Sequence, residues 1–259
     1  MIPDISSLVM LSIFAVLSAI IGSIIGAGGG FIYTPLLILM GYTPRDAVST
    51  SLVMVFFNSL SASYAYYKQR RINIRETIPL GIVTLPGAVV GAFILSSVDV
   101  RDFRIIFGVF LAAVSVYIII KALQGKNEDE ISVADGLYCR SIRRAYILSP
   151  LAGVLSSLFG VGGGILLVPT FIHIALIPTH IATATSQFIT IFSSYFSLIL
   201  LTATKPLLTI KIPVVAVSGI IGGQIGARIS KRLKARIIKT IIAIVLIITA
   251  INIILEIKL

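Results

Sequence analysis

The chain alternates long apolar runs with short polar breaks. Apolar runs, most of them near 20 residues long, cover approximately residues 5–25, 47–67, 78–95, 103–122, 145–159, 181–202, 210–227 and 237–255. A helix of about 20 apolar residues crosses the hydrocarbon core of a bilayer, which is about 30 Å thick. The pattern therefore predicts an all-α, polytopic integral membrane protein of the cell (inner) membrane.

Composition strengthens this assignment. The 259 residues are 57% hydrophobic and only 12% charged, whereas soluble domains carry about 25% charged residues. The formal net charge of +11 suits anionic lipid head groups beside cytoplasmic loops better than nucleic acid. The single cysteine, Cys139, excludes an internal disulfide, and the first apolar run is expected to be retained as a span because no small-residue cleavage site follows it.

A glycine-rich phrase occurs twice, 134 positions apart (160 minus 26). The first copy is Gly26-Ala-Gly-Gly-Gly-Phe-Ile-Tyr-Thr-Pro35, and the second is Gly160-Val-Gly-Gly-Gly-Ile-Leu-Leu-Val-Pro169. Further echoes link Ala47–Ser51 with Ala182–Ser186, and Gly87–Ala92 with Gly222–Ala227. Such internal symmetry is typical of duplicated transporters. We predict a first membrane repeat over residues 1–123, a cytoplasmic linker over 124–144 and a second membrane repeat over 145–259, each repeat with about five helical segments.

The distribution of basic residues bears on how the two repeats are oriented. If each repeat crosses the membrane five times, the repeats are inverted. Fifteen of the 21 lysines and arginines then share one side, in the stretches 68–75, 121–144 and 228–239. The positive-inside rule makes that side cytoplasmic and places both termini outside. In the alternative, the short apolar pieces after the glycine phrases are re-entrant, and eight crossings give parallel repeats. The charge pattern favours inverted repeats.

The glycine phrases precede unusually short apolar pieces. Residues 31–40 would make a helix of about 15 Å, half the thickness of the hydrocarbon core, so a short or broken helix is expected after each phrase. Consecutive glycines allow close packing of helices. They also allow a break that exposes backbone N–H groups at a helix start, where the helix dipole favours an anion. The repetition favours the second interpretation.

Polar side chains accompany the phrases in the third and eighth segments. Serine and threonine in membrane helices often only join helices, but together these side chains offer hydroxyl and amide donors near the glycine breaks. Buried amides in particular need partners. The predicted substrate-binding residues are Gly28, Gly29, Gly30, Ser49, Thr50, Ser51, Asn58, Gly162, Gly163, Gly164, Thr183, Thr185, Ser186, Gln187 and Gln224.

The sequence gives little support to catalysis or to a cofactor. The phrases lack the lysine and Ser/Thr of a nucleotide-binding P-loop, and aspartate and glutamate fall in the breaks rather than inside the spans. Only His173 is expected at membrane depth as a candidate proton relay, while His180 is expected in a loop. We therefore expect no enzyme activity, no metal and no cofactor.

The two phrases, the Ala-x-x-Thr-Ser motifs ending at Ser51 and Ser186, and the Gly-Ala pairs at 91–92 and 226–227 resemble the TauE/SafE family of sulfite exporters and 4-toluene sulfonate uptake permeases. The resemblance covers essentially the whole chain. It implies a secondary transporter that moves small sulfur-containing or organic anions, such as sulfite, sulfoacetate or other sulfonates, by alternating access. The partners would be that anion, membrane lipid and a coupling proton or sodium ion; the oligomeric state, including a homo-oligomer, is left open. A passive anion channel is the alternative. One asymmetry stands out: Thr34 precedes the first proline and Val168 the second.

Overall fold

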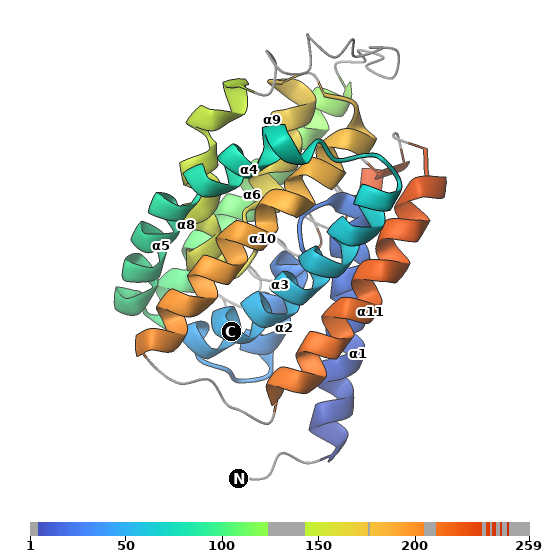
Figure 1. The fold of residues 1–259 in the computed structure, drawn as a ribbon. Coiled ribbons are helices and arrows are strands. Elements are labelled where there is room, and N and C mark those ends of the chain that lie inside the picture. Colours follow the sequence, from blue (N-terminus) through green and yellow to red (C-terminus); the bar gives the residue numbers. More distant parts are fainter. Residues whose placement is uncertain are drawn as a thin grey trace.

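The chain folds into a bundle of helices. A computed structural model describes residues 5–123, 143–175, 177–204 and 211–234, with isolated positions between 237 and 248. Within these residues there are no strands (Figure 1). The elements are α1 (Ile5–Ile25), α2 (Gly30–Leu39), α3 (Pro44–Lys68), α4 (Ile74–Val83), α5 (Leu85–Ser97), α6 (Val100–Leu123), the 3₁₀ helix η2 (Arg143–Ile147), α8 (Ser149–Phe159), α9 (Gly164–His173), α10 (Thr179–Thr204) and α11 (Lys211–Arg232). The predicted linker lies mainly outside the described residues, with its last two residues at the start of η2.

Five stretches of the described chain are long and apolar enough to cross a membrane. They are Leu8–Ile25, Pro44–Lys68, Ile74–Ser97, Thr179–Ala203 and Ile212–Arg232. The third of these joins α4 and α5 across Thr84, where Pro86 interrupts the helical hydrogen bonding because proline has no N–H. The prediction of an all-α, polytopic membrane protein is confirmed.

Helix α3 begins before the apolar run at 47–67: the hydroxyl of Thr43 accepts from the N–H of Asp46 at 3.3 Å and donates to its carboxylate at 2.8 Å, with Pro44 in the first helical position. One local prediction needs correction. His180 is not in a loop. It lies in the first turn of α10, because Thr179 already begins that helix after Pro178.

Matching helices of the two repeats run in opposite directions. In Figure 1, α1 and α3 rise while α8 and α10 descend, and α5 descends while α11 rises. Gln69, just after α3, donates to the carbonyl of Ala227 in α11 at 3.2 Å, so the basic stretches beginning at Lys68 and Arg228 meet at one end of the bundle. Inverted repeats require this arrangement, whereas the eight-crossing alternative puts those stretches at opposite ends.

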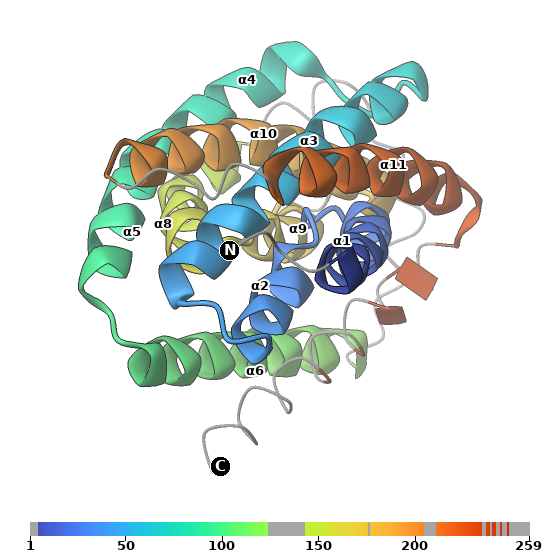
Figure 2. The same cartoon turned by 90° about the horizontal axis from the view of Figure 1, so that it is seen from below.

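Each repeat packs one of its helices against the first helix of the other. A Cβ at Gly87 or Gly91 of α5 would lie 1.8 Å from the carbonyl oxygen of Pro150 or 2.2 Å from that of Val154, both in α8. The corresponding glycines of α11 also lie close to the backbone of α1: a Cβ at Gly222 would lie 2.9 Å from the carbonyl oxygen of Val16, and one at Gly226 would lie 2.4 Å from that of Ile20. The shared Gly-Ala motifs therefore mark two equivalent contacts between the repeats, α5 on α8 and α11 on α1 (Figure 2).

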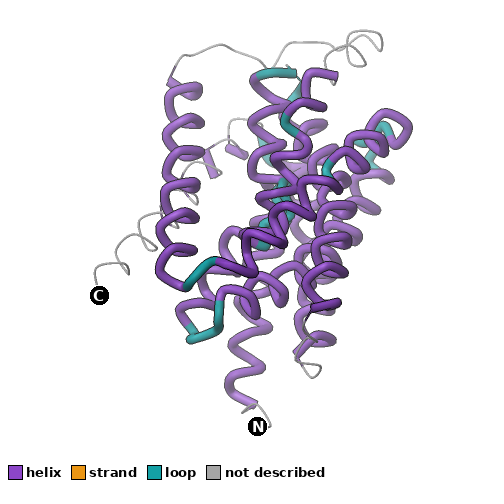
Figure 3. Tube along the Cα trace, turned by 90° about the vertical axis from the view of Figure 1, so that its left-hand side faces the viewer, coloured by secondary structure: helices purple, strands orange, loops and turns teal. Residues whose placement is uncertain are grey.

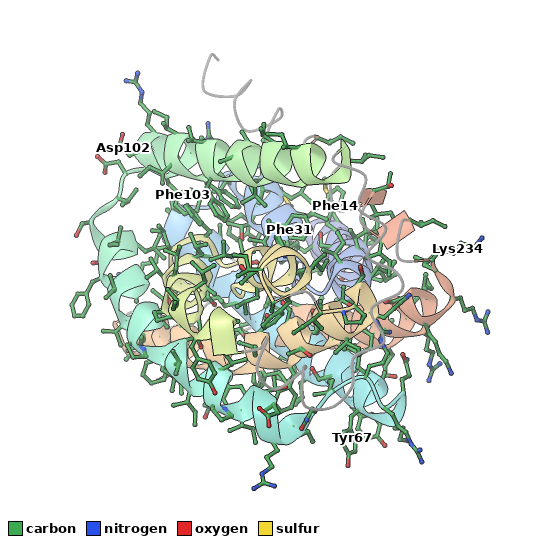
Figure 4. All side chains as sticks on the ribbon, turned by 90° about the horizontal axis from the view of Figure 1, so that it is seen from above. Phe14, Phe31, Tyr67, Asp102, Phe103 and Lys234 are labelled. Atoms are coloured by element: carbon green, nitrogen blue, oxygen red, sulfur yellow. The ribbon has the colours of Figure 1, made fainter. Side chains whose placement is uncertain are left out.

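Helix α6 closes one side of the bundle through aromatic packing. The ring of Phe159 at the end of α8 stacks on Phe107 at 4.6 Å and on Phe110 at 5.5 Å, and meets the edge of Phe103 at 5.6 Å. Figure 4 shows Phe103 pointing inward from α6, while Asp102 and Lys234 lie at the rim. The interior is thus apolar with hydroxyl and amide groups, and the labelled charges lie outside it.

Candidate functional site

The helix breaks at the two glycine phrases have the same backbone geometry. Gly26, Gly28 and Gly29 have φ values of 84°, 76° and 87°, and their counterparts Gly160, Gly162 and Gly163 have 70°, 79° and 76°. These left-handed conformations disfavour any residue with a Cβ. Each phrase therefore ends one helix and starts another, α2 at Gly30 and α9 at Gly164. The short helices expected after the phrases are present, and Figure 3 shows loop segments inside the bundle as well as at its ends.

The two breaks lie against each other in the interior. A Cβ on Gly30 would lie 1.9 Å from the carbonyl oxygen of Gly160, and one on Gly164 would lie 2.6 Å from that of Gly26. A Cβ on either Gly28 or Gly162 would meet the side chains of Val55 in α3 and Thr190 in α10. The same glycines therefore both break a helix and allow two backbones to pack closely. From this meeting point α2 runs toward one end of the bundle and α9 toward the other (Figure 1).

Side chains of α3 and α10 hold the glycine carbonyls in two matching pairs. The amide of Asn58 donates to the carbonyl of Gly28 at 2.9 Å, and the hydroxyl of Ser193 donates to that of Gly162 at 2.8 Å. Across the repeats, Ser51 donates to the carbonyl of Gly160 at 3.0 Å. Its counterpart Ser186 donates to those of Gly26 at 2.9 Å and Gly164 at 3.3 Å.

The network departs from symmetry where the sequences of the repeats differ. Oε1 of Gln187 accepts from the N–H of Gly28 at 3.2 Å, and its amide donates to Ser59 at 3.2 Å. The counterpart of Gln187, at an offset of 135 positions, is Leu52, which offers no acceptor to Gly162. Likewise Thr34 donates to the carbonyl of Phe159 at 2.9 Å, a bond that its counterpart Val168 cannot make. The two glycine breaks are therefore chemically unequal.

Several backbone donors at the two helix starts have no acceptor within the described part of the protein. These N–H groups belong to Gly30 and Phe31 at the start of α2 and to Gly164 and Ile165 at the start of α9. All four residues are buried. First-turn N–H groups of a helix carry the positive end of its dipole and suit an anion. The arrangement thus offers neutral, preorganised donors that can hold a small anion without a charged side chain.

The remaining predicted residues lie around this network rather than within it. Ser49 and Thr185 are buried and Thr50 is half-buried, and among the described residues no hydrogen bond joins the side chain of Ser49 or Thr50 to the glycine phrases. Gln224 donates instead to the carbonyl of Ser61 at 2.8 Å, joining α11 to α3. Thr183 packs its backbone on Gly26 while its hydroxyl faces Arg71. The side chain of His173 lies outside the described residues.

Four residues beyond the predicted set complete the network. Ser23 donates to Oδ1 of Asn58 at 2.7 Å and its carbonyl accepts from Tyr66, while Ser59 and Ser193 make the bonds given above. The repeat offset signals Ser193, since 135 positions separate it from Asn58. No local signal marks Ser23 or Tyr66, because their roles depend on how α1 crosses α3. Among the described residues, no group of three or more histidines, cysteines or carboxylates could hold a metal ion.

The fold and this interior site define a multi-pass membrane protein built from two similar, oppositely running sets of helices around paired helix breaks. Residues 11–253 match the family described as sulfite exporter TauE/SafE. The chain belongs to this family of membrane transporters, as its glycine phrases indicate.

Curated relatives carry corresponding names. The chain is 29% identical over 208 residues to "Probable membrane transporter protein YunE" of Bacillus subtilis (strain 168), covering 73% of this chain and 76% of that protein. It is 30% identical over 184 residues to "Probable membrane transporter protein MJ0441" of Methanocaldococcus jannaschii, covering 68% and 66%. A more distant relative, "Sulfite exporter TauE/SafE family protein 3" of Arabidopsis thaliana, is 27% identical over 121 residues, 47% of this chain and 25% of that protein. No solved structure matches the chain.

Proposed function

We propose that this transporter carries small oxyanions, with sulfite and organic sulfonates as the first candidates, by alternating access. The main observation in support is the pair of buried helix starts, at Gly30 and Gly164, whose first N–H groups have no acceptor within the described residues. A buried donor without a partner costs about 1–3 kcal/mol, so an anion that accepts from several such donors stabilises the site. The description of the family, sulfite exporter TauE/SafE, supports sulfite as the first candidate.

The surrounding side chains suit an anion of this kind. Ser51, Asn58, Ser186 and Gln187 are completely buried, and their hydroxyl and amide groups can donate to oxygen atoms of the substrate when they exchange partners. Transport requires that the anion is bound and then released. Neutral donors bind and release an anion more readily than a buried lysine or arginine would. We place Gly28–Gly30 and Gly162–Gly164 on the substrate itself and these four side chains around it.

The orientation follows from charge. The end of the bundle that carries Lys68, Arg70, Arg75, Arg228 and Lys231 is proposed as cytoplasmic by the positive-inside rule. In alternating access the α3–α10 contact would open first toward one end and then toward the other, with the glycine breaks as the fixed centre.

The test is uptake of radiolabelled sulfite into proteoliposomes that contain the full chain, with and without a pH or sodium gradient. Unlabelled sulfonates, sulfate and chloride serve as competitors. Saturable uptake that responds to a gradient and is inhibited by sulfonates supports the proposal. Uptake that does not saturate indicates the passive channel instead, and absence of sulfite flux refutes this substrate class.

A further inference from the structure

Arg71 occupies an unusual position for a basic residue of a connecting segment. It lies between α3 and α4, yet its side chain is half-buried and turns inward, whereas its neighbour Arg70 is exposed. The guanidinium lies over the ring of Tyr66, 4.5 Å from the ring centre. It therefore belongs to the interior of this end of the bundle rather than to the solvated surface.

The bonds of Arg71 join the two repeats. Nε donates to the carbonyl of His180 at 3.0 Å and Nη2 to the same oxygen at 2.6 Å. Nη2 also donates to the hydroxyl of Thr183 at 3.0 Å, and it lies 3.4 Å from that of Ser230. One side chain of the first repeat thus fastens the starting turns of α10 and the end of α11.

All of these acceptors are neutral. The remaining donor, Nη1, bonds to the amide oxygen of Gln69 at 3.1 Å; no described carboxylate pairs with the guanidinium. Burial lowers the pKa of Arg71 below its ordinary value, which indicates a cation whose charge is poorly compensated. An anion adds attraction between opposite charges and can accept two parallel bonds from one guanidinium, so a small anion would compete well with neutral oxygens for these donors.

A line of polar groups on the α3–α10 contact connects Arg71 with the glycine breaks. Gln187, bonded to Gly28, donates to Ser59 of α3. One helical turn further toward Arg71 is Ser63, on the same face of α3 as Ser59, and its buried hydroxyl has no hydrogen-bond partner among the described residues. On the α10 side, Thr183 lies one turn from Gln187 and already bonds to Arg71.

We propose that Arg71 is a second anion-binding position, at the proposed cytoplasmic end of the α3–α10 contact, and that the anion opens this end by replacing the neutral oxygens of α10 and α11 on the guanidinium. This inference rests on the proposed function, since it supplies the entry or exit step for the same anion. At an offset of 135 positions the second repeat has Pro206 in place of Arg71, and the side chain of proline cannot donate.

The first measurement is sulfite uptake by proteoliposomes containing Arg71→Gln, Arg71→Lys or the control Arg70→Gln, which removes the same charge one position away. We expect KM to rise at least about tenfold in Arg71→Gln, less in Arg71→Lys, and less than about twofold in Arg70→Gln. An unchanged KM in Arg71→Gln, or an equal rise in Arg70→Gln, would overturn the role of Arg71.

A second measurement keeps Arg71 intact. In a Cys139→Ser background, Ser230→Cys places the only thiol at a buried position beside the guanidinium. We expect sulfite, but not an equal concentration of gluconate, to accelerate its reaction with a membrane-impermeant thiol reagent severalfold. Equal rates with and without sulfite, alongside saturable transport, reject the opening step alone. Equal rates without any transport reject the proposed function as well.

Discussion

Asn58 and Ser193 occupy equivalent positions in the two repeats, but their side chains make different numbers of hydrogen bonds to other segments of the chain. Asn58 donates to the carbonyl of Gly28 and accepts from the hydroxyl of Ser23, at 2.9 and 2.7 Å. Ser193 has one such bond, to the carbonyl of Gly162 at 2.8 Å. Substituting Asn58→Leu leaves two buried polar groups without partners, whereas Ser193→Ala leaves one.

The expected losses of unfolding free energy follow from the number of buried polar groups that each substitution leaves unpaired. An orphaned buried group costs about 1–3 kcal/mol, and hydrogen bonds between membrane helices lie at the low end because the unfolded chain also finds partners in the membrane. We therefore expect Asn58→Leu to lower the free energy of unfolding by about 2 kcal/mol and Ser193→Ala by less than about 1 kcal/mol.

Reversible unfolding by SDS in mixed micelles, followed by circular dichroism, measures both variants against the parent. Sulfite uptake by the same preparations reports the site, and Asn58→Leu should also raise KM because the Gly28 turn loses its anchor. An equal or larger loss of stability in Ser193→Ala would refute the reasoning, as would full stability of Asn58→Leu.

Two further predictions concern glycines at close contacts. Gly30→Ala should prevent stable folding, because the new Cβ would lie 1.9 Å from the carbonyl oxygen of Gly160. The control Gly41→Ala has open space around its Cβ and should lower the free energy of unfolding by only about 1–2 kcal/mol, the cost of its positive φ. The yield of monodisperse protein in detergent compares the two variants, and equal yields contradict the expected clash. Gly226→Leu should separate α11 from α1 and lower the melting temperature in detergent, since its Cβ would lie 2.4 Å from the carbonyl oxygen of Ile20. A melting temperature within about 1–2 °C of the parent protein would show that this packing contributes little to stability.

The sequence was sufficient for the glycine breaks because their requirement is local. A backbone with φ near 80° admits glycine far more readily than other residues, so a repeated run of glycines before a short apolar piece predicts both the break and the short helix. The matching of Asn58 with Ser193, and of Ser51 with Ser186, is also accessible from the repeat offset. These residues depend on position within a duplicated pattern rather than on a particular fold.

The buried position of Arg71 could not be predicted in this way. Its principal acceptor, the carbonyl of His180, is 109 positions away along the chain. In the sequence it is one cation among Lys68, Arg70 and Arg75, and nothing local distinguishes an inward-facing guanidinium from a solvated one. The same applies to Gln224, whose amide joins α11 to α3 because the helices of the two repeats are interleaved.

That interleaving has a consequence for how such a chain can be assembled. The glycine faces of α5 and α11 are each covered by the first helix of the opposite repeat, so a single repeat leaves its own glycine face uncovered. One copy could bury that face in the same way only against a second copy inserted upside down. If the two sets of helices descend from one duplicated unit, as the repeated glycine phrases suggest, joining them in one chain would turn an encounter between two molecules into an event within one.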